Sequence, residues 1–195
     1  MSARRRRAPK KARRPPPRAC ISIESPIGTL RIEADEEAVR IVAFAEERRA
    51  ASDGEVAGAA RALVQKAAAE LAEYFAGDRR EFSVPVAPEG TRFQTRVWRE
   101  LQRIGYGSTR SYGEVARSIG HRRAARAVGA ANHENPVAVI VPCHRVIGVD
   151  RTLVGYGGGL DKKEWLLRHE AKHAGTFAPA PAGPAAKVAA RATGR

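Results

Sequence analysis

Apolar and polar residues alternate at the start of the folded part of the chain. The alternation covers residues 21–23 and 30–32, on either side of the sequence Ser25-Pro26-Ile27-Gly28. Period-two alternation across a turn of this composition predicts a β-hairpin. The short apolar run Val39–Phe44 predicts a third strand.

The pattern then changes to a helical period. Residues 56–75 are Ala-rich and place four apolar side chains on one face: Leu63, Val64, Leu71 and Phe75. This spacing predicts a helix, and Gly77 predicts its end. Pro85 and Pro88 follow in what we interpret as a linker.

Helical signals dominate the next segment. Thr91-Arg92-Phe93-Gln94 and Ser111-Tyr112-Gly113-Glu114 each match a capping box, in which side chains satisfy the free N–H groups of a helix start. The second box predicts a short helix through Ile119. Gly120 interrupts it, and a helix resumes over 122–131. Two short helices across a glycine turn suggest a helix-turn-helix, although any αα-corner has the same pattern.

The second of these helices is unusually thin. Apart from Arg122, Arg123 and Arg126, its side chains are nearly all small. A helix that reads the major groove normally displays long polar side chains. A thin helix instead favours close approach to a narrow groove and its phosphates. Arg126 is long enough to fill the gap left by an extruded base, or it is an ordinary surface arginine.

The apolar run Val137–Val141 predicts a buried strand that leads into Cys143 and His144. A thiol beside a base and near an arginine has the ingredients of a nucleophile. Adjacent residues point to different sides, so a direct bond between the two side chains needs a tight turn or a bridging water. Spacing alone leaves three candidates for the acid that orients the histidine: Glu134, Glu164 and Glu170.

Charge separates the chain into four parts. Residues 1–18 hold nine basic and no acidic residues, and residues 172–195 hold four basic and no acidic residues. Residues 19–90 hold 8 basic and 14 acidic residues, whereas residues 91–171 hold 14 and 7, within a net charge of +14. We expect two disordered tails (1–18 and 172–195), an αβ domain over 19–88, and a basic domain over 89–171 suited to a polyanion.

The chain has two cysteines, no apolar leader and no run of membrane-spanning length. These features predict a protein of a reducing compartment, cytoplasmic and nucleoid-associated if bacterial, without a membrane partner.

Several motifs resemble one known family in order along residues 91–170. They are Ser111-Tyr112-Gly113-Glu114-Val115-Ala116, Arg126-Ala127-Val128-Gly129-Ala130-Ala131-Asn132, Asn135-Pro136, Pro142-Cys143-His144-Arg145-Val146-Ile147-Gly148, Gly155-Tyr156-Gly157-Gly158-Gly159-Leu160 and Lys163-Glu164-Trp165-Leu166-Leu167-Arg168-His169-Glu170. The sequence resembles the methylated-DNA–protein-cysteine S-methyltransferases, also called O6-alkylguanine-DNA alkyltransferases. The likeness over 20–76 is looser.

The resemblance implies an α+β fold, with a small ribonuclease H-like αβ domain followed by a winged-helix-like helix-turn-helix domain. It implies single-turnover repair as a monomer, in which an alkyl group moves from a flipped guanine O6, with O4-alkylthymine a further candidate, to the protein. The partner would be double-stranded DNA bound through the minor groove, and no cofactor would be needed.

Site residues follow from the same resemblance. The catalytic set would be Cys143, His144, Glu170, Asn135 and Tyr112. DNA would meet Arg126, Tyr112, Ala127, Gly129, Ala130, Asn132, Arg122 and Arg123. The pocket for the base would include Val146, Tyr156, Gly157 and Lys163.

The resemblance also assigns roles within the catalytic set. Cys143 would accept the alkyl group, with His144 removing its proton through a water and Glu170 polarising the imidazole. Asn135 would hold the active-site turn. Tyr112 would donate a proton toward the leaving base.

Some relatives bind zinc in their first domain. Here that segment has Cys20 and no histidine, so we predict no metal site. Two other classes of function compete with repair: a lesion-binding or regulatory DNA-binding protein that performs no transfer, and a cysteine hydrolase, which would leave the helix-turn-helix unexplained.

Overall fold

The structure is a computed structural model that describes residues 18–45 and 58–175. The first described elements are three strands, β1 (Ala19–Ile23), β2 (Leu30–Ala34) and β3 (Val39–Phe44). They form an antiparallel sheet in the order β1-β2-β3, with Ile21 opposite Ile32. The turn between β1 and β2 is closed by the Gly28 N–H, which donates to the Ser25 carbonyl at 3.0 Å. The hairpin and third strand predicted from the sequence are therefore confirmed.

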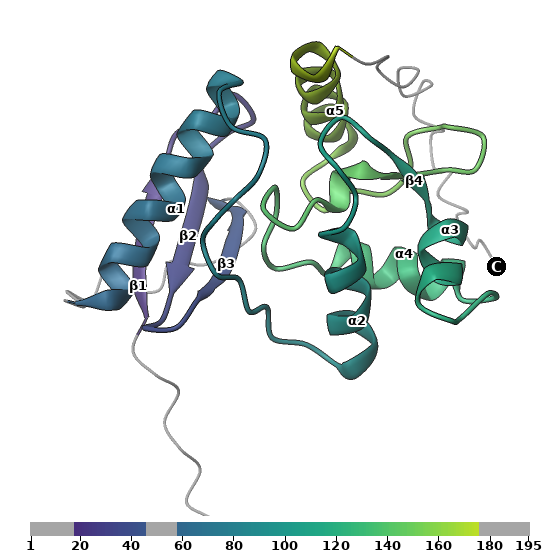
Figure 1. Cartoon of the computed structure of the whole chain (residues 1–195), viewed down its shortest axis with the longest axis horizontal. Helices are drawn as coiled ribbons and strands as arrows, with labels where there is room; N and C mark the ends of the chain where they lie inside the picture. The colour runs from purple at the N-terminus through teal and green to yellow at the C-terminus, as the bar shows by residue number, and fades with distance from the viewer. Residues whose placement is uncertain (1–17, 46–57, 176–195) are drawn as a thin grey trace, which may run out of the picture.

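Helix α1 (Ala59–Ala76) packs along this sheet (Figure 1). It ends at Gly77, whose φ of 92° is the left-handed conformation that glycine adopts without strain. The predicted end is confirmed. Residues 56 and 57, the first two of the predicted helix, lie outside the described residues.

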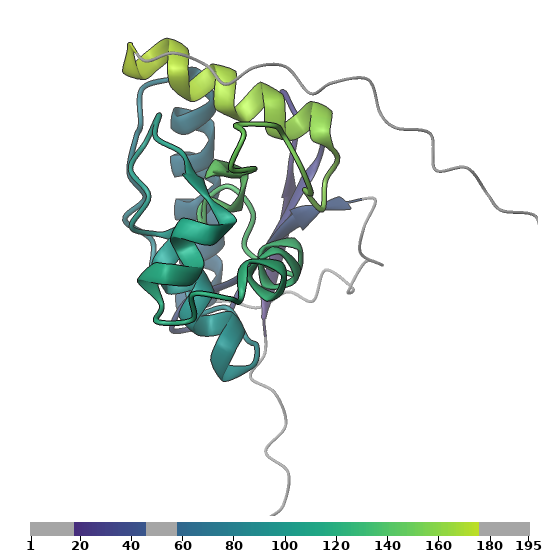
Figure 2. The same cartoon turned by 90° about the vertical axis from the view of Figure 1, so that its right-hand side faces the viewer.

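The second half of the chain is mostly helical. It contains α2 (Arg92–Leu101), α3 (Tyr112–Ser118), α4 (Ala125–His133) and α5 (Leu160–Ala174). Both predicted capping boxes are present, at Thr91 with Gln94 and at Ser111 with Glu114. The two-residue strands β4 (Arg110–Ser111) and β5 (Val146–Ile147) pair in parallel. Figure 2 shows α5 running across one end of the molecule.

The start of helix α4 and the start of the expected C-terminal tail differ from the sequence prediction. Helix α4 begins at Ala125 rather than Arg122, because the chain first forms a turn in which the Ala124 N–H donates to the His121 carbonyl at 2.8 Å. Helix α5 continues to Ala174, into the segment expected to be a tail. The remainder of that expected tail, residues 176–195, and residues 1–17 lie outside the described ranges.

The predicted strand over Val137–Val141 is wrong. Only Val137 bridges to the sheet, beside Val42, and Ala138–Ile140 form turns. Val139 has a φ of 69°, a left-handed conformation that is rare for a β-branched residue. The apolar pattern indicated burial correctly, since all five residues are buried, but burial is achieved here without a strand.

One hydrophobic core joins the two halves. A single cluster of buried residues includes Leu30 and Val42 of the sheet, Leu71 of α1, and Leu101 and Cys143 of the second half. The backbone reinforces this contact, because the Val42 N–H donates to the Pro136 carbonyl at 2.9 Å and the Ala138 N–H donates to the Val42 carbonyl at 2.8 Å. The segment before Cys143 is thus fixed directly to β3.

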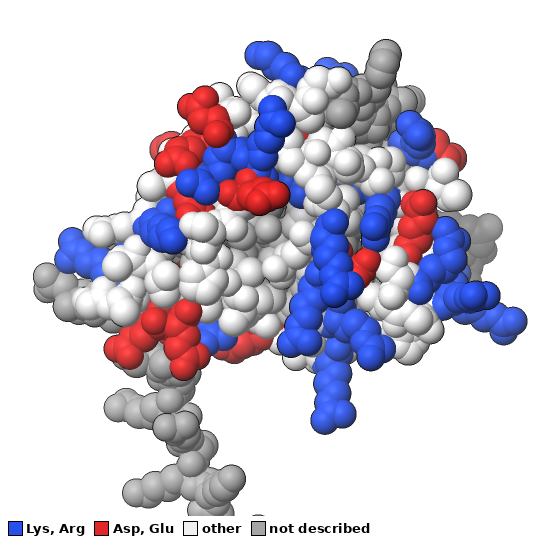
Figure 3. Space-filling model, viewed as in Figure 1, with Lys and Arg blue, Asp and Glu red and all other residues white. Residues whose placement is uncertain are grey.

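Charge is unevenly distributed over the surface. Lys and Arg side chains gather over the region of α2 and α3, whereas Asp and Glu lie mainly over the sheet and α1 side (Figure 3). Within the described ranges, no helix is both long enough and apolar enough to cross a membrane.

Candidate active site and DNA-binding surface

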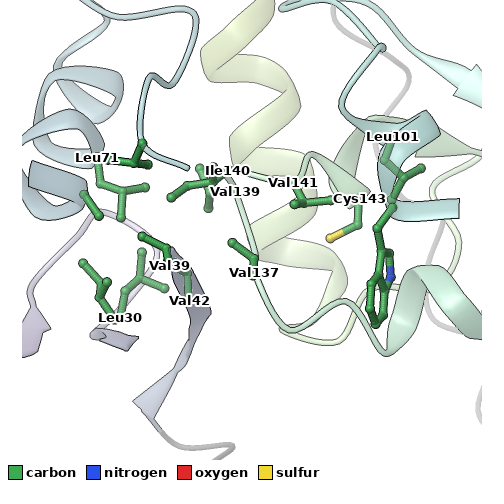
Figure 4. Packing of buried hydrophobic residues seen from close by; sticks show 14 of the residues in the cluster. Leu30, Val39, Val42, Leu71, Leu101, Val137, Val139, Ile140, Val141 and Cys143 are labelled. Carbon is green, nitrogen blue, oxygen red and sulfur yellow. The ribbon is translucent and has the colours of Figure 1, made fainter. Parts of the chain in front are cut away.

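Cys143 lies at the start of the short 3-10 turn η2 (Cys143–Arg145), directly after the buried turns that contact the sheet (Figure 4). Only 4% of the residue is exposed. Burial raises the pKa of its thiol, and the side chains of Asn135 and Lys163 oppose that effect. The resting cysteine is therefore a protonated thiol, and it needs a base before it can act as a nucleophile.

His144, the residue after Cys143, is completely buried. The Nε2 atom of His144 lies 2.8 Å from Glu170 Oε1. Burial lowers the pKa of His144, and it is therefore neutral near pH 7; the carboxylate opposes this shift. Because a carboxylate can only accept, Nε2 carries the hydrogen of the neutral ring. Nδ1 is then the basic nitrogen, and it is buried without a hydrogen-bond partner among the described residues.

Glu170 is the acid among the three candidates that contacts His144. Arg145 donates to both of its oxygens, at 2.8 Å to Oε1 and 2.9 Å to Oε2. The Tyr74 hydroxyl donates to Oε1 at 2.8 Å, and the Gly107 N–H donates to Oε2 at 3.0 Å. Burial alone would raise the pKa of Glu170. His144 and Arg145 outweigh this effect and keep the pKa far below its usual range, so the buried carboxylate stays ionised.

Two asparagines hold the backbone around the thiol. Asn135 Nδ2 donates to the Val141 carbonyl at 2.9 Å, and its Oδ1 accepts from the Val137 N–H at 3.1 Å. Asn132 was expected at the DNA surface, but it is 2% exposed, and its Nδ2 donates to the Cys143 carbonyl at 3.1 Å. This hydrogen bond holds the Asn132 side chain in the interior. The expectation that Asn132 binds DNA is therefore corrected, because its side chain binds the backbone of Cys143 instead.

Lys163 and Tyr112 bind the loop before α5. Lys163 is fully buried, and its Nζ donates to the Val146 and Val154 carbonyls at 2.6 and 2.8 Å. Burial lowers its pKa to about 8. The Tyr112 hydroxyl donates to the Val154 carbonyl at 2.9 Å, and burial followed by the nearby Cys143 raises its pKa to about 12. Tyr112 therefore keeps its proton at neutral pH.

The loop expected to cover the base packs against the N-terminal sheet. Tyr156 is buried, and its ring meets Phe44 of β3 edge-on, with centroids 6.3 Å apart. A Cβ on Gly158 would lie 2.1 Å from the Phe44 ring, so only glycine fits there. Gly157 is exposed, and Val146 is fully buried in β5 with its carbonyl held by Lys163.

The remaining residues expected to bind DNA lie on the helix-turn-helix formed by α3 and α4. Arg122, Arg123, Arg126, Ala127 and Ala130 are exposed. Gly129 lies beside the Tyr112 ring, where an added Cβ would be 3.8 Å from it. The exposed face of α4 is therefore narrow, with Arg126 as its long side chain.

Sequence reasoning gave Tyr74 no role and read Arg145 only as positive charge near the thiol, although both side chains bind Glu170. Arg145 lies inside the reactive motif, and its position after His144 was the available signal. Tyr74 precedes Glu170 by 96 residues, and helical spacing could only have marked it as a core aromatic. Among the described residues, no group of three or more His, Cys, Asp and Glu side chains could hold a metal ion.

The geometry defines a class of protein in which a buried cysteine, supported by a histidine–glutamate pair, lies next to a thin-faced helix-turn-helix. Two family models match the chain: "6-O-methylguanine DNA methyltransferase, ribonuclease-like domain" over residues 19–88, and the DNA-binding domain of the same family over residues 92–172. The chain belongs to the 6-O-methylguanine DNA methyltransferase family.

Individual relatives support the same family assignment. The chain is 47% identical over 147 residues to a methylated-DNA–protein-cysteine methyltransferase of Methanosarcina acetivorans, covering 75% of this chain and 94% of that one. It is 58% identical over 104 residues to the protein of that name from Mycolicibacterium paratuberculosis, covering 53% and 63%. The crystal structure of Mycobacterium tuberculosis OGT in complex with DNA is similar with a TM-score of 0.70 and 44% identity, covering 82% and 94%.

Proposed function

We propose that this protein performs direct-reversal DNA repair by moving a methyl or other alkyl group from guanine O6 in DNA to Cys143. The observation that carries the proposal is the buried relay, in which His144 Nε2 binds Glu170 at 2.8 Å immediately beside the thiol. The family membership and the helix-turn-helix support DNA as the carrier of the substrate.

The residues divide the chemistry between them. His144 Nδ1 accepts the thiol proton through a water, and ionised Glu170 stabilises the imidazolium that forms. The Cys143 sulfur then attacks the alkyl carbon, so that the new S–C bond forms as the C–O6 bond breaks. The bonding electrons pass to the guanine, and neutral Tyr112 donates a proton to it. A thioether is not displaced by water, so each molecule acts once.

Access to the O6 position requires the base to leave the helical stack. We propose that α4 enters the minor groove, because its small exposed residues permit close approach, and that Arg126 occupies the space left by the base. A minor-groove dye should compete with the protein for DNA, whereas cytosine methylation in the major groove should leave affinity unchanged. We also propose a cytoplasmic monomer, since a reducing compartment preserves the thiol.

Intact-protein mass spectrometry tests the central reaction. The protein is mixed with a duplex that carries one O6-methylguanine, and we expect a gain of one methyl group per molecule. Cys143→Ala should abolish the gain, whereas the matched control Cys20→Ala should retain it. Tight lesion binding without a mass change would instead place the chain among lesion-binding proteins that perform no transfer.

A further inference from the structure

Helix α2 and the turn that follows it carry four arginines, which we name the arginine stripe: Arg92, Arg96 and Arg99 on α2, and Arg103 two residues beyond its end. The spacing of four and three residues puts the first three on the same side of the helix. All four are exposed, whereas Val97, Trp98 and Leu101 on the other side of α2 are buried. Figure 3 shows blue side chains gathered over this region.

The stripe is poorly neutralised by the protein itself. Arg103 pairs with Glu100 at 3.0 Å, and Glu100 also pairs with Arg110 at 2.9 Å. Within the part of the chain that the structure describes, Arg92, Arg96 and Arg99 have no carboxylate within ion-pair distance. Like charges one turn apart repel each other, so an anionic partner would relieve a cost that the folded protein otherwise bears.

The stripe is continuous with the helix-turn-helix. Arg96 Nη1 lies 3.3 Å from Nε2 of His121, which belongs to the turn between α3 and α4. The stripe lines a hollow together with Ser118 and Ile119 at the end of α3. Arg117, Arg122 and Arg123 line a second hollow around the same turn. Basic side chains thus extend without a break from α2 to the start of α4.

The length and chemistry of the stripe favour DNA over an acidic protein. The ten residues of α2 span about 15 Å, which is about four base-pair steps along a duplex at 3.4 Å per step. Guanidinium groups match phosphate oxygens well. The turn at His121 places the stripe beside the proposed DNA-binding helix rather than on a separate face.

We propose that the arginine stripe of α2 is a second DNA-binding track, which binds backbone phosphates flanking the site where α4 docks. The inference rests on the proposed function and extends it, because the DNA contact then reaches beyond the helix-turn-helix. Phosphate contacts carry no sequence information. The track therefore strengthens binding to any duplex and holds the protein in position while undamaged bases are sampled.

The test measures binding to an undamaged duplex over a range of salt concentrations. Each lost phosphate contact lowers the slope of log K against log salt by about 0.9. The triple variant Arg92→Gln, Arg96→Gln and Arg99→Gln should therefore lower the slope by about 2 to 3. Thermal unfolding close to that of the wild type would verify that the exposed substitutions leave the fold intact.

A matched control separates local contacts from net charge. Arg61→Gln, Lys66→Gln and Arg168→Gln together remove the same charge from α1 and α5, and this variant should retain nearly the wild-type slope. Equal slopes for the two triple variants would overturn the proposal. A wild-type slope for the stripe variant would also overturn it and would leave an acidic protein as the occupant.

The outcome does not depend on the chemistry at Cys143, because the duplex carries no lesion. Methyl transfer is measured separately at low salt with saturating O6-methylguanine duplex, where the stripe variant should still gain one methyl group. Failure of the wild type to gain a methyl group would reject the proposed function, while the salt slopes would still decide the role of the stripe.

Discussion

Substitution Tyr74→Phe tests whether the N-terminal half adjusts His144, the base that we propose activates Cys143. Tyr74 and His144 donate to the same oxygen, Glu170 Oε1, each at 2.8 Å. Burial raises the pKa of Tyr74 well above its usual value, so its hydroxyl is a neutral donor throughout the assay range. Removing that donor leaves Oε1 a stronger acceptor for His144, which should raise the pKa of the imidazole.

The cost in stability follows from the lost bond. A hydrogen bond to a charged group contributes about 1.5–3 kcal/mol. The ring itself stays packed against Phe75, Phe82 and Tyr106, so no large cavity forms. A domain of this size changes its Tm by about 2–4 °C per kcal/mol. We therefore expect a Tm several degrees lower, in a protein that is still folded at 25 °C.

The informative readout is the pH dependence of single-turnover methyl transfer, followed by mass spectrometry. In the proposed relay His144 must be neutral to accept the thiol proton, so the rate should fall as pH drops through the His144 pKa. With that pKa raised, the acidic limb should move to higher pH, and the rate well above the limb should equal or exceed that of the wild type.

A neighbouring tyrosine provides the control. Besides Tyr74, the polar groups that act on the His144–Glu170 pair are Arg145, Tyr106 and His169, which interact with Glu170, and Lys163, which interacts with His144. Tyr106→Phe removes a hydroxyl that has no hydrogen-bond partner among the described residues. Tyr106→Phe should leave the pH profile in place. An acidic limb that stays in place or moves to lower pH in Tyr74→Phe would refute the reasoning, even if the Tm falls.

Two further substitutions test the loop and the buried cation. Gly158→Ala should destabilise the protein by about 1–3 kcal/mol, because its Cβ would lie 2.1 Å from the Phe44 ring. In Gly157→Ala the nearest atom would be 3.4 Å away, so similar Tm values for the two variants would contradict this. Lys163→Met tests the lowered pKa of about 8, against 10.5 for an ordinary lysine. Between these pH values the unfolded chain binds more protons, so the Lys163 contribution to the unfolding free energy should rise with pH, by up to about 3 kcal/mol. A constant difference between wild type and Lys163→Met from pH 8 to 10.5 would show that Lys163 keeps its charge.

Local signals predicted most of the elements correctly. The two capping boxes, the hairpin around Ser25–Gly28 and the end of α1 at Gly77 depend on short-range backbone chemistry that the sequence displays directly. The strand prediction for Val137–Val141 was wrong because an apolar pattern indicates burial and does not distinguish a strand from buried turns. Whether a buried backbone joins a sheet depends on its hydrogen-bond partners, which here are the distant strand β3 and the nearby Asn135 side chain.

The candidate site was predictable only in part, for a related reason. Chemistry at neighbouring positions identified Cys143 and His144, but spacing left three acids open, and only the resemblance pointed to Glu170. The inward orientation of Asn132, the burial of Lys163 and the bond from Tyr74 all depend on how α4, α5 and α1 pack. None of these contacts has a local sequence signal.

The backbone bonds between β3 and the segment before Cys143 have a consequence for protein engineering. A cut between residues 88 and 89 would give one fragment with Val42 and Tyr74 and another with the nucleophile. The second fragment would lack the backbone partners of Pro136 and Ala138 and one donor to Glu170. Such a split protein would label itself only when fused partners bring the halves together, so the covalent mark on Cys143 would be a permanent record of their proximity.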